Sequence, residues 1–320
     1  MMPQQTRLVG LDVSKHKIDA CIHGVAERGM AASTPEGEAE LVAWLRRHGV
    51  GEAVMEASGG YEQGWAAALR RAGFAVRIVD PRRVRYFAKS AGRLAKNDPI
   101  DAAMIAWFGV TFPASQASLP PEPERRKLDQ LVTARSALLE LDAALANREE
   151  HEQPTLVAKA QAAVRKTLHA QVKKLDKAIA AMIAEDPVIA RRAEIITSVP
   201  GLGVQAAAGL IAWLPELGHV DDKAIAALVG VAPYDDDSGE RRGERHIKGG
   251  RQKLRNLLYM PTLTASTQCN PVLKPCYQRW RAKGKEAKVA LVACMHKLMR
   301  ILNTMLARDE TWNPPTRAAA

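Results

Sequence analysis

Short apolar runs alternate with amphipathic stretches over residues 8–107, and this alternation constrains the fold more than any other feature of the sequence. Apolar runs bounded by turn residues predict strands at Leu8–Val13, Ile18–Ile22, Ala53–Glu56 and Phe74–Val79. Helical spacing predicts helices at Glu36–His48, Tyr61–Ala72 and Pro99–Trp107. Strands that alternate with helices predict an α/β domain, which we place at residues 1–115.

Two long amphipathic helices are predicted after a linker rich in Pro, Ser and Ala at Phe112–Pro121. Leucines recur at threes and sevens before Pro154, and apolar residues do so after it, which predicts a coiled-coil hairpin within residues 116–190. We expect this arm to have a structural or oligomerising role rather than to bind nucleic acid directly. A mainly helical C-terminal domain is expected at residues 191–310, followed by a tail at residues 311–320.

The chain of 320 residues is strongly basic, with a formal net charge of +11 and a pI near 9.6. Lys and Arg gain affinity for nucleic acids by displacing counterions from phosphates, so a polyanion is the first partner to consider. A ribosomal protein would fit this charge equally well. Residues 241–300 carry fifteen Lys and Arg against two acidic residues, so we expect the phosphate-facing surface to be mainly C-terminal.

The cysteines Cys21, Cys269, Cys276 and Cys294 form no Cys-x-x-Cys pair and lack the His spacing of a zinc site. We therefore expect free thiols in a reducing compartment. No run approaches the roughly 20 unbroken apolar residues of a membrane helix, and no apolar signal segment opens the chain. These features predict a cytoplasmic protein of bacterial type, without a membrane contact and associated with the nucleoid when bound to DNA.

Four carboxylates occupy positions from which they can converge. Asp12 lies inside an apolar strand, and Glu56 ends another. Asp98 and Asp101 are three residues apart at the start of a helix and so share one face. A charge in a buried strand is costly unless it is paired or bound to a metal, although Asp98 alone would also serve as an N-cap before Pro99. As a set they predict a Mg²⁺ or Mn²⁺ site in a ribonuclease-H-like domain.

A Pro-Gly-x-Gly turn at Val199–Gly203 lies between two apolar helical stretches. Such a turn places free backbone N–H groups, here around Gly201 and Gly203, where a DNA phosphate can bind without any base being read. This helix-hairpin-helix-like motif is a candidate nucleic-acid site, and packing alone is the other reason for a glycine-rich turn.

A polar loop that begins at Asp235 offers one hydroxyl, that of Ser238, beside a run of cations. Cations can compensate a phosphate that a serine attacks. Ser-Gly is also an ordinary turn signal, and spacing assigns no general base, His246 being one candidate. The candidate nucleic-acid-binding cations are Arg241, Arg242, Arg245, Lys248, Arg251, Lys253, Arg255, Lys285 and Lys288.

In this order the motifs resemble those of the DEDD-type insertion-sequence transposases of the IS one-ten family, which includes the Piv/MooV DNA invertases and the bridge-RNA-guided recombinases. The matching segments are Gly10–Lys15, Glu56–Tyr61, Lys96–Ala102, Val199–Gly203, Gly230–Pro233, Ser238–Gly239, Gly284–Lys288 and Lys297–Leu298. The likeness runs over nearly the whole chain. Pro99 and the acidic run Asp235–Asp237 depart from the family's pattern.

The resemblance implies a RuvC-like domain whose metal site consists of Asp12, Glu56, Asp98 and Asp101, and a second domain whose catalytic serine is Ser238. It implies that target and donor DNA are cut and rejoined through a phosphoserine link, with the carboxylates of one subunit completed by the serine of another. The further partners that it implies are a noncoding bridge RNA of the element and other copies of the chain, as a dimer and as a tetramer in the synaptic complex.

Two other functions fit parts of the sequence. A Holliday-junction resolvase would use the carboxylates and a metal but has no need of Ser238 and its domain. A nucleic-acid-binding protein without chemistry would keep the basic region but has no need of four carboxylates. An NTPase is excluded because the sequence has no GxxxxGK[ST] loop.

Overall fold

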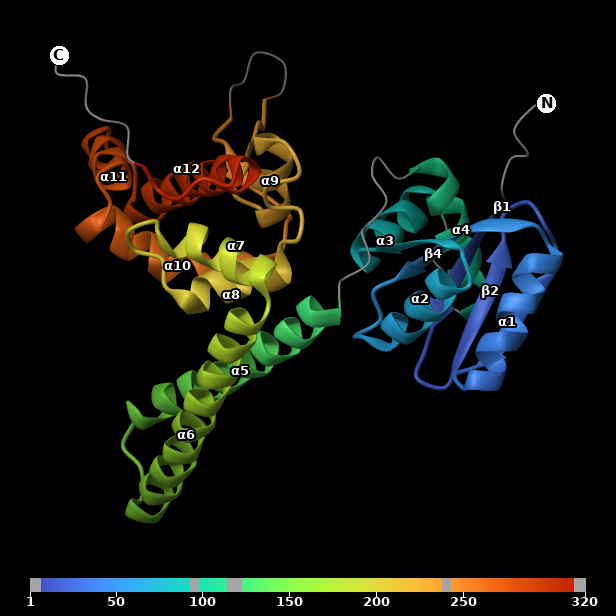
Figure 1. The fold of residues 1–320 in the computed structure, drawn as a ribbon, viewed down its shortest axis with the longest axis horizontal. Helices are drawn as coiled ribbons and strands as arrows, with labels where there is room; N and C mark the ends of the chain where they lie inside the picture. Colours follow the sequence, from blue (N-terminus) through green and yellow to red (C-terminus); the bar gives the residue numbers. More distant parts are fainter. Residues whose placement is uncertain (1–6, 93–97, 114–122, 238–242, 314–320) are drawn as a thin grey trace. The chain divides into compact units, whose positions relative to one another are not determined.

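The structure, a computed structural model, describes residues 7–92, 98–113, 123–237 and 243–313, and of residues 98–100 and 123–124 it describes the backbone only. The chain divides into two compact units, Met1–Pro120 and Pro121–Ala320 (Figure 1). The first unit contains the four predicted strands and the three predicted helices. It also contains a strand at Arg28–Ala32 and a helix at Pro81–Ser90 that were not predicted.

A five-stranded sheet forms the centre of the first unit. Its strands are β1 (Arg7–Val13), β2 (Lys17–Ile22), β3 (Arg28–Ala32), β4 (Val50–Glu56) and β5 (Ala75–Val79), in the spatial order β3-β2-β1-β4-β5. The first three strands form an antiparallel meander, and β4 and β5 are parallel to β1. This mixed α/β arrangement fits the ribonuclease-H-like domain that the sequence predicts.

Helices cover both faces of this sheet. The helices α1 (Pro35–Arg47) and α2 (Tyr61–Arg71) enclose one core with strand residues such as Val9 and Leu11. The helices α3 (Pro81–Ser90) and α4 (Asp98–Thr111) enclose a second core with Leu8 and Val54. Because side chains alternate between the faces of a strand, Leu8 and Val9 mark the opposite faces of the sheet. The sheet and α4 together position the predicted carboxylates.

The second unit begins with two long helices that pack against each other and project from the rest of that unit, here called the arm (Figure 1). They are α5 (Pro123–Glu149) and α6 (Thr155–Glu185). Ion pairs join them along their length, including Arg135 to Asp176 at 2.5 Å and Arg165 to Asp142 at 2.8 Å. The predicted pair of helices around Pro154 is present, and the coiled-coil geometry of their packing stays a prediction.

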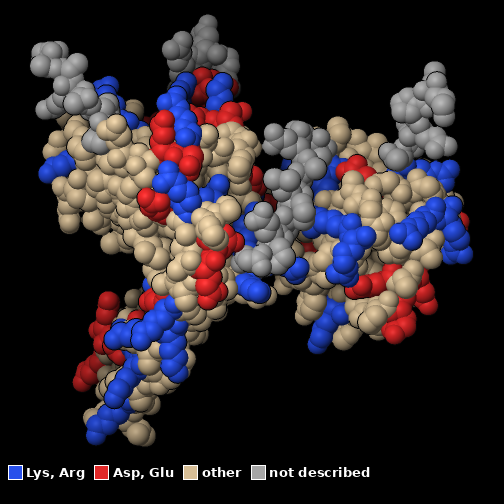
Figure 2. All heavy atoms as spheres, viewed as in Figure 1, with Lys and Arg blue, Asp and Glu red and all other residues tan. Residues whose placement is uncertain are grey.

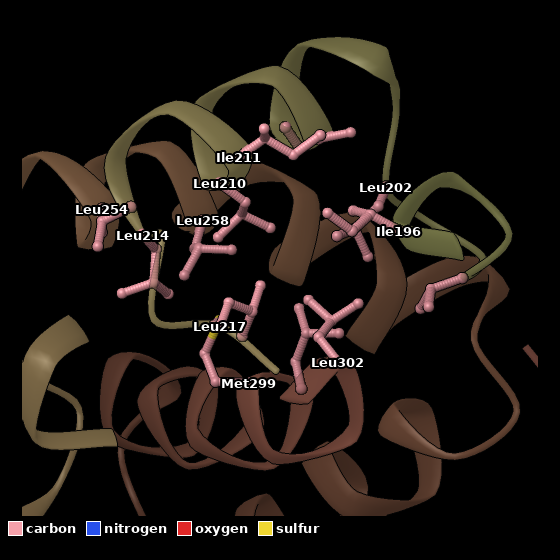
Figure 3. Packing of buried hydrophobic residues seen from close by; sticks show 14 of the residues in the cluster. Ile196, Leu202, Leu210, Ile211, Leu214, Leu217, Leu254, Leu258, Met299 and Leu302 are labelled. Atoms are coloured by element: carbon pink, nitrogen blue, oxygen red, sulfur yellow. The ribbon is translucent and has the colours of Figure 1, made fainter. Parts of the chain in front are cut away.

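The remainder of the second unit is mainly helical, as predicted. Its helices are α7 (Pro187–Thr197), α8 (Val204–Trp213), α9 (Asp222–Val229), α10 (Gln252–Thr264), the π-helical turn η1 (Ala265–Cys269), α11 (Leu273–Ala282) and α12 (Ala287–Arg308). They enclose one apolar core, in which Leu210 and Leu214 of the α8 region face Leu258, Met299 and Leu302 (Figure 3). Burial of Leu128 and Ile179 in the same core anchors the base of the arm.

The helix α12 is long and apolar, although Lys288, Lys297 and Arg300 interrupt its apolar residues, so it is not an unbroken apolar run of the kind that was expected to be absent. Among the described residues it is the one helix long and apolar enough, by length and composition, to cross a membrane; it has 22 residues, and half of its apolar 18-residue window is buried in the protein. Leu298, Met299 and Leu302 pack in the core of the second unit. Its apolar character is therefore accounted for by core packing.

All four cysteines are free, as predicted. Cys21, Cys276 and Cys294 are buried, and Cys269 is exposed. Burial raises the pKa of Cys294 to about 11, so this thiol stays protonated near neutral pH and behaves as a small apolar side chain.

Candidate active site

Asp12 and Glu56 end two neighbouring parallel strands. In the β1–β4 ladder Gly10 lies opposite Val54 and Leu11 opposite Met55, so the next residues along each strand, Asp12 and Glu56, are neighbours. Both side chains are half-buried. The strand ladder thus unites two of the predicted carboxylates at one end of the sheet, here called the carboxylate edge.

The first turn of α4 is directed to the same edge. A β-carbon at Gly10 would lie 2.2 Å from the carbonyl oxygen of Ala102, and one at Gly109 would meet Leu8, so α4 runs antiparallel to β1. Asp98 precedes Ala102 by one helical turn, about 6 Å. Asp12 lies two strand residues beyond Gly10, also about 6 to 7 Å.

Because side chains alternate along a strand, Asp12 lies on the same face of the sheet as Gly10, and Glu56 lies on the same face as Val54. Val54 contacts α4 at Gly109. The start of α4 and both strand carboxylates therefore share one side of the sheet. Asp101 is half-buried beside Ala102, whereas the side chain of Asp98 lies outside the described part of the structure. Within that part, no cluster of three or more His, Cys, Asp or Glu side chains is arranged as a metal site.

The loop after Glu56 is fixed by a buried carboxylate that sequence reasoning missed. Glu62 is only 4% exposed and accepts hydrogen bonds from the backbone N–H groups of Ser58 and Gly60, both at 2.9 Å. The Ser58 hydroxyl donates to the carbonyl oxygen of Glu56 at 3.2 Å. Glu62 therefore orders the segment that follows Glu56. Its position in the first turn of a helix after a Gly-Gly pair was the available sequence signal.

The predicted serine loop extends from a short hairpin of β6 (Pro233–Tyr234) and β7 (His246–Ile247). Two contacts close the neck of the loop: an ion pair between Asp235 and Arg245 at 2.5 Å, and a hydrogen bond from the Gly243 N–H to Asp237 at 3.1 Å. Two of the three unusual acidic residues thus have partners within the neck. Ser238, Arg241 and Arg242 lie outside the described residues.

The Pro-Gly-x-Gly segment connects α7 to α8. Gly201 has a positive φ of 101°, and a β-carbon there would lie 2.6 Å from that of Ala265, so this glycine is required for packing. Gly203, by contrast, is exposed at the start of α8, and a β-carbon there would meet nothing within 4 Å. The two glycines thus have different local surroundings, and their predicted binding to nucleic acid stays a prediction.

Besides Arg245, which pairs with Asp235, three of the predicted phosphate-binding cations already have partners within the second unit. Arg251 pairs through both terminal nitrogens with Glu216, at 2.8 and 2.5 Å. Burial favours a raised pKa for Glu216, but the hydrogen bonds and charge of Arg251 outweigh it and the pKa is lowered. Arg255 donates to the carbonyl oxygens of Val229 and Gly249.

Lys253 lies over the Trp213 ring, 4.7 Å from its centroid, and burial lowers the pKa of its ammonium group. Lys248, Lys285 and Lys288 are instead exposed. Lys and Arg also line the arm, for which no nucleic-acid contact was predicted, beside the acidic residues that pair with some of them (Figure 2). Exposed cations are therefore not confined to residues 241–300.

Comparison with known families defines the class of this protein. Residues 9–151 match the DEDD family described as "Transposase", and residues 193–278 match "Transposase IS116/IS110/IS902 family". A chain with both matches is a DNA transposase or recombinase, and hence an enzyme. It belongs to the IS110 (IS one-ten) family, so the resemblance drawn from the sequence motifs is confirmed.

Individual relatives agree with this assignment. The chain is 25% identical to the "Pilin gene-inverting protein" of Moraxella lacunata over 329 residues, which covers 95% of this chain and 97% of that protein. It is 29% identical to the "Insertion element IS110 uncharacterized 43.6 kDa protein" of Streptomyces coelicolor over 147 residues, or 45% of this chain and 35% of that protein. The first likeness extends through both units.

Proposed function

We propose that this transposase cuts and rejoins DNA with a divalent-metal site of Asp12, Glu56, Asp98 and Asp101 and with Ser238 as its nucleophile. The observation that carries the proposal is the carboxylate edge, where parallel pairing makes Asp12 and Glu56 neighbours. The direction of α4 adds Asp101 and the backbone of Asp98 at the same edge.

The donor set fits a hard divalent cation. Carboxylate oxygens suit Mg²⁺ and Mn²⁺, and the half-buried carboxylates at this edge come from three elements, so they can approach one cation from several sides. A metal bound there would polarise a phosphate and stabilise its developing charge. The role of the protein is to orient the oxygens, and the Gly10–Ala102 approach and the Glu62 loop serve that role.

The serine step keeps the phosphorus in a phosphodiester, because a bond to serine replaces the bond to a sugar oxygen. The Ser238 Oγ would form a bond to phosphorus as the bond to one sugar oxygen breaks; the hydroxyl proton leaves the serine, and the displaced sugar oxygen ends as a hydroxyl. Attack by a sugar hydroxyl on the protein–DNA ester reverses these changes and frees Ser238. The step needs no ATP, in agreement with the lack of an NTP-binding loop in the sequence.

The carboxylates and the serine belong to different domains. We assign the carboxylates to a domain at residues 1–115 and Ser238 to one at residues 191–310, with the linker and arm at 116–190 between them and a tail at 311–320. We propose that the complete site forms between copies, in a dimer and then in a synaptic tetramer. A bridge RNA of the element would select target and donor DNA in the cytoplasm.

Replacing one carboxylate tests the metal site. Asp12→Asn and Asp101→Asn should each lose strand cutting and weaken Mn²⁺ binding, measured by titration calorimetry, while the folded state and DNA binding stay near normal. Glu38→Gln, on the opposite face of the sheet, is the matched control and should bind Mn²⁺ like the parent. Full cutting by either Asn variant would disprove the assignment.

Replacing the serine tests the nucleophile. The parent should leave protein covalently bound to DNA on a denaturing gel, and Ser238→Ala should not, because no other oxygen is proposed to form that ester. A mixture of Asp12→Asn and Ser238→Ala proteins should regain partial recombination through composite sites. An undiminished adduct in Ser238→Ala would eliminate this serine and favour a resolvase that uses water.

A further inference from the structure

An exposed helix face beside the carboxylate edge combines cations with an aromatic ring. Positions three and four apart lie on one side of a helix, and on α3 this places Arg82, Arg85, Tyr86 and Lys89 together. Tyr86 is 69% exposed, and the three cations around it are exposed as well. We call these four residues the α3 face.

The opposite side of α3 accounts for the packing of the helix. Val84 is buried at 3% exposure, and Phe87 makes edge contacts with the rings of Trp107 and Phe108, with centroids 4.9 and 5.8 Å apart. Arg83 lies over Phe108 at 5.3 Å. The core of the unit therefore does not need Tyr86, and the exposed ring calls for another explanation.

The α3 face begins at the carboxylate edge. Glu56 lies opposite Val79 in the parallel ladder, and the N–H of Ala57 donates to the Val79 carbonyl oxygen at 3.1 Å. Asp80 then caps α3 and pairs with Arg82 at 2.8 Å. Tyr86 follows within about 8 Å along the helix axis. A nucleic-acid strand bound to the α3 face would therefore lie close to Glu56.

We propose that the α3 face binds an unpaired segment of the DNA strand that is led to the carboxylate edge. The ring of Tyr86 would stack on one base, and Arg85 and Lys89 would contact the adjacent phosphates. Neither Arg85 nor Lys89 forms an ion pair with a described residue. In an intact duplex the faces of the bases are already stacked, so an exposed ring favours an unpaired strand.

The charge of the face serves the same end. Phosphates approach the carboxylate edge against repulsion from Asp12 and Glu56, and neighbouring cations offset that repulsion. The inference rests on the proposed function only in the destination of the strand, because binding itself does not require cutting. It goes beyond the expectation that residues 241–300 form the main phosphate-facing surface.

Binding by the full-length chain in the Asp12→Asn background tests the proposal without cleavage. For a short fluorescein-labelled single strand, Tyr86→Leu should weaken binding about tenfold, and Tyr86→Phe should not, because it keeps the ring. Arg85→Gln with Lys89→Gln should reduce the slope of log affinity against log salt by about 1.4. Arg47→Gln with Arg71→Gln is the charge-matched control, because these residues lie on α1 and α2, which cover the opposite face of the sheet. This pair of substitutions should leave the slope unchanged.

A photocrosslink locates the contact. A single strand containing iodouracil should crosslink to Tyr86, as mapped by mass spectrometry of the full chain. Adducts confined to residues 191–320, together with parental affinity of Tyr86→Leu, would overturn the proposal. Equal losses of duplex and single-strand affinity would also overturn it, in favour of a surface for the duplex backbone. Loss of self-association with unchanged DNA binding would reassign the face to a contact between copies.

Discussion

Gly10 of β1 lies directly beneath the carbonyl oxygen of Ala102 in α4, so closely that a β-carbon at Gly10 would be 2.2 Å from that oxygen. This approach determines how near the first turn of α4 comes to Asp12. We predict that Gly10→Ala displaces the helix, destabilises the first unit by roughly 1 to 3 kcal/mol, and impairs Mn²⁺ binding and DNA cutting.

Urea unfolding followed by circular dichroism and Mn²⁺ calorimetry would measure both effects. Gly64→Ala is the control, because a β-carbon at Gly64 meets nothing within 4 Å and α2 should tolerate it. Parental metal affinity in Gly10→Ala would show that the carboxylate edge does not depend on this close contact.

Arg77 of β5 holds the other end of α4. Its guanidinium donates to the carbonyl oxygens of Gly109, at 2.8 Å, and of Phe112, and it pairs with Glu52 at 3.0 Å. Only 10% of its side chain is exposed. Arg77→Met should lower the free energy of unfolding by roughly 3 kcal/mol, because it leaves Glu52 without its ion-pair partner and two carbonyl groups without this donor.

The exposed Arg71, which has only a 3.8 Å contact with Glu38, is the matched control. Arg71→Met should change the free energy of unfolding by at most about 0.5 kcal/mol. A similar loss in both variants, measured by urea unfolding, would contradict a specific role for Arg77.

Two groups of C-terminal cations should respond differently to mutation. Lys285 and Lys288 are exposed, so Lys285→Gln with Lys288→Gln should reduce the salt dependence of duplex binding by about 1.8 in the logarithmic slope and leave stability unchanged. Arg251→Gln should instead lower stability by roughly 1 to 3 kcal/mol, because Glu216 loses its bidentate partner. Binding titrations at several salt concentrations and thermal unfolding separate the two effects.

The free energy of unfolding of the first unit should depend on pH through the titration of His48. Hydrogen bonds to the Trp44 carbonyl oxygen, at 2.7 Å, and to Glu27, at 2.9 Å, raise the pKa of His48. A raised pKa in the folded state means that the contribution is complete below the unfolded value, about 6.5, and is lost as the pH rises through the folded value. His48→Gln should remove this part of the pH dependence of unfolding, whereas an unchanged pH profile would show that the pair contributes nothing.

Local pattern was sufficient for most of the secondary structure. Apolar periodicity and the prolines at positions 35, 154 and 187 mark elements whose formation depends mainly on neighbouring residues. The strand β3 was missed because Arg28–Ala32 lacks an alternating apolar pattern: Met30 is 69% exposed, and Gly29 packs against the Trp44 ring. Its strand conformation comes from pairing with β2, which is a tertiary interaction.

The sequence by itself determined the family, most of the elements other than β3 and α3, and the types of residue available for chemistry, because these follow from composition, spacing and motif. Only the tertiary structure decided which of them are neighbours. Parallel pairing joined Asp12 to Glu56, the missing β-carbon of Gly10 admitted α4, and burial paired Arg251 with Glu216. Contacts between residues distant in the chain depend on the packing of whole elements, and spacing along the sequence does not encode that packing.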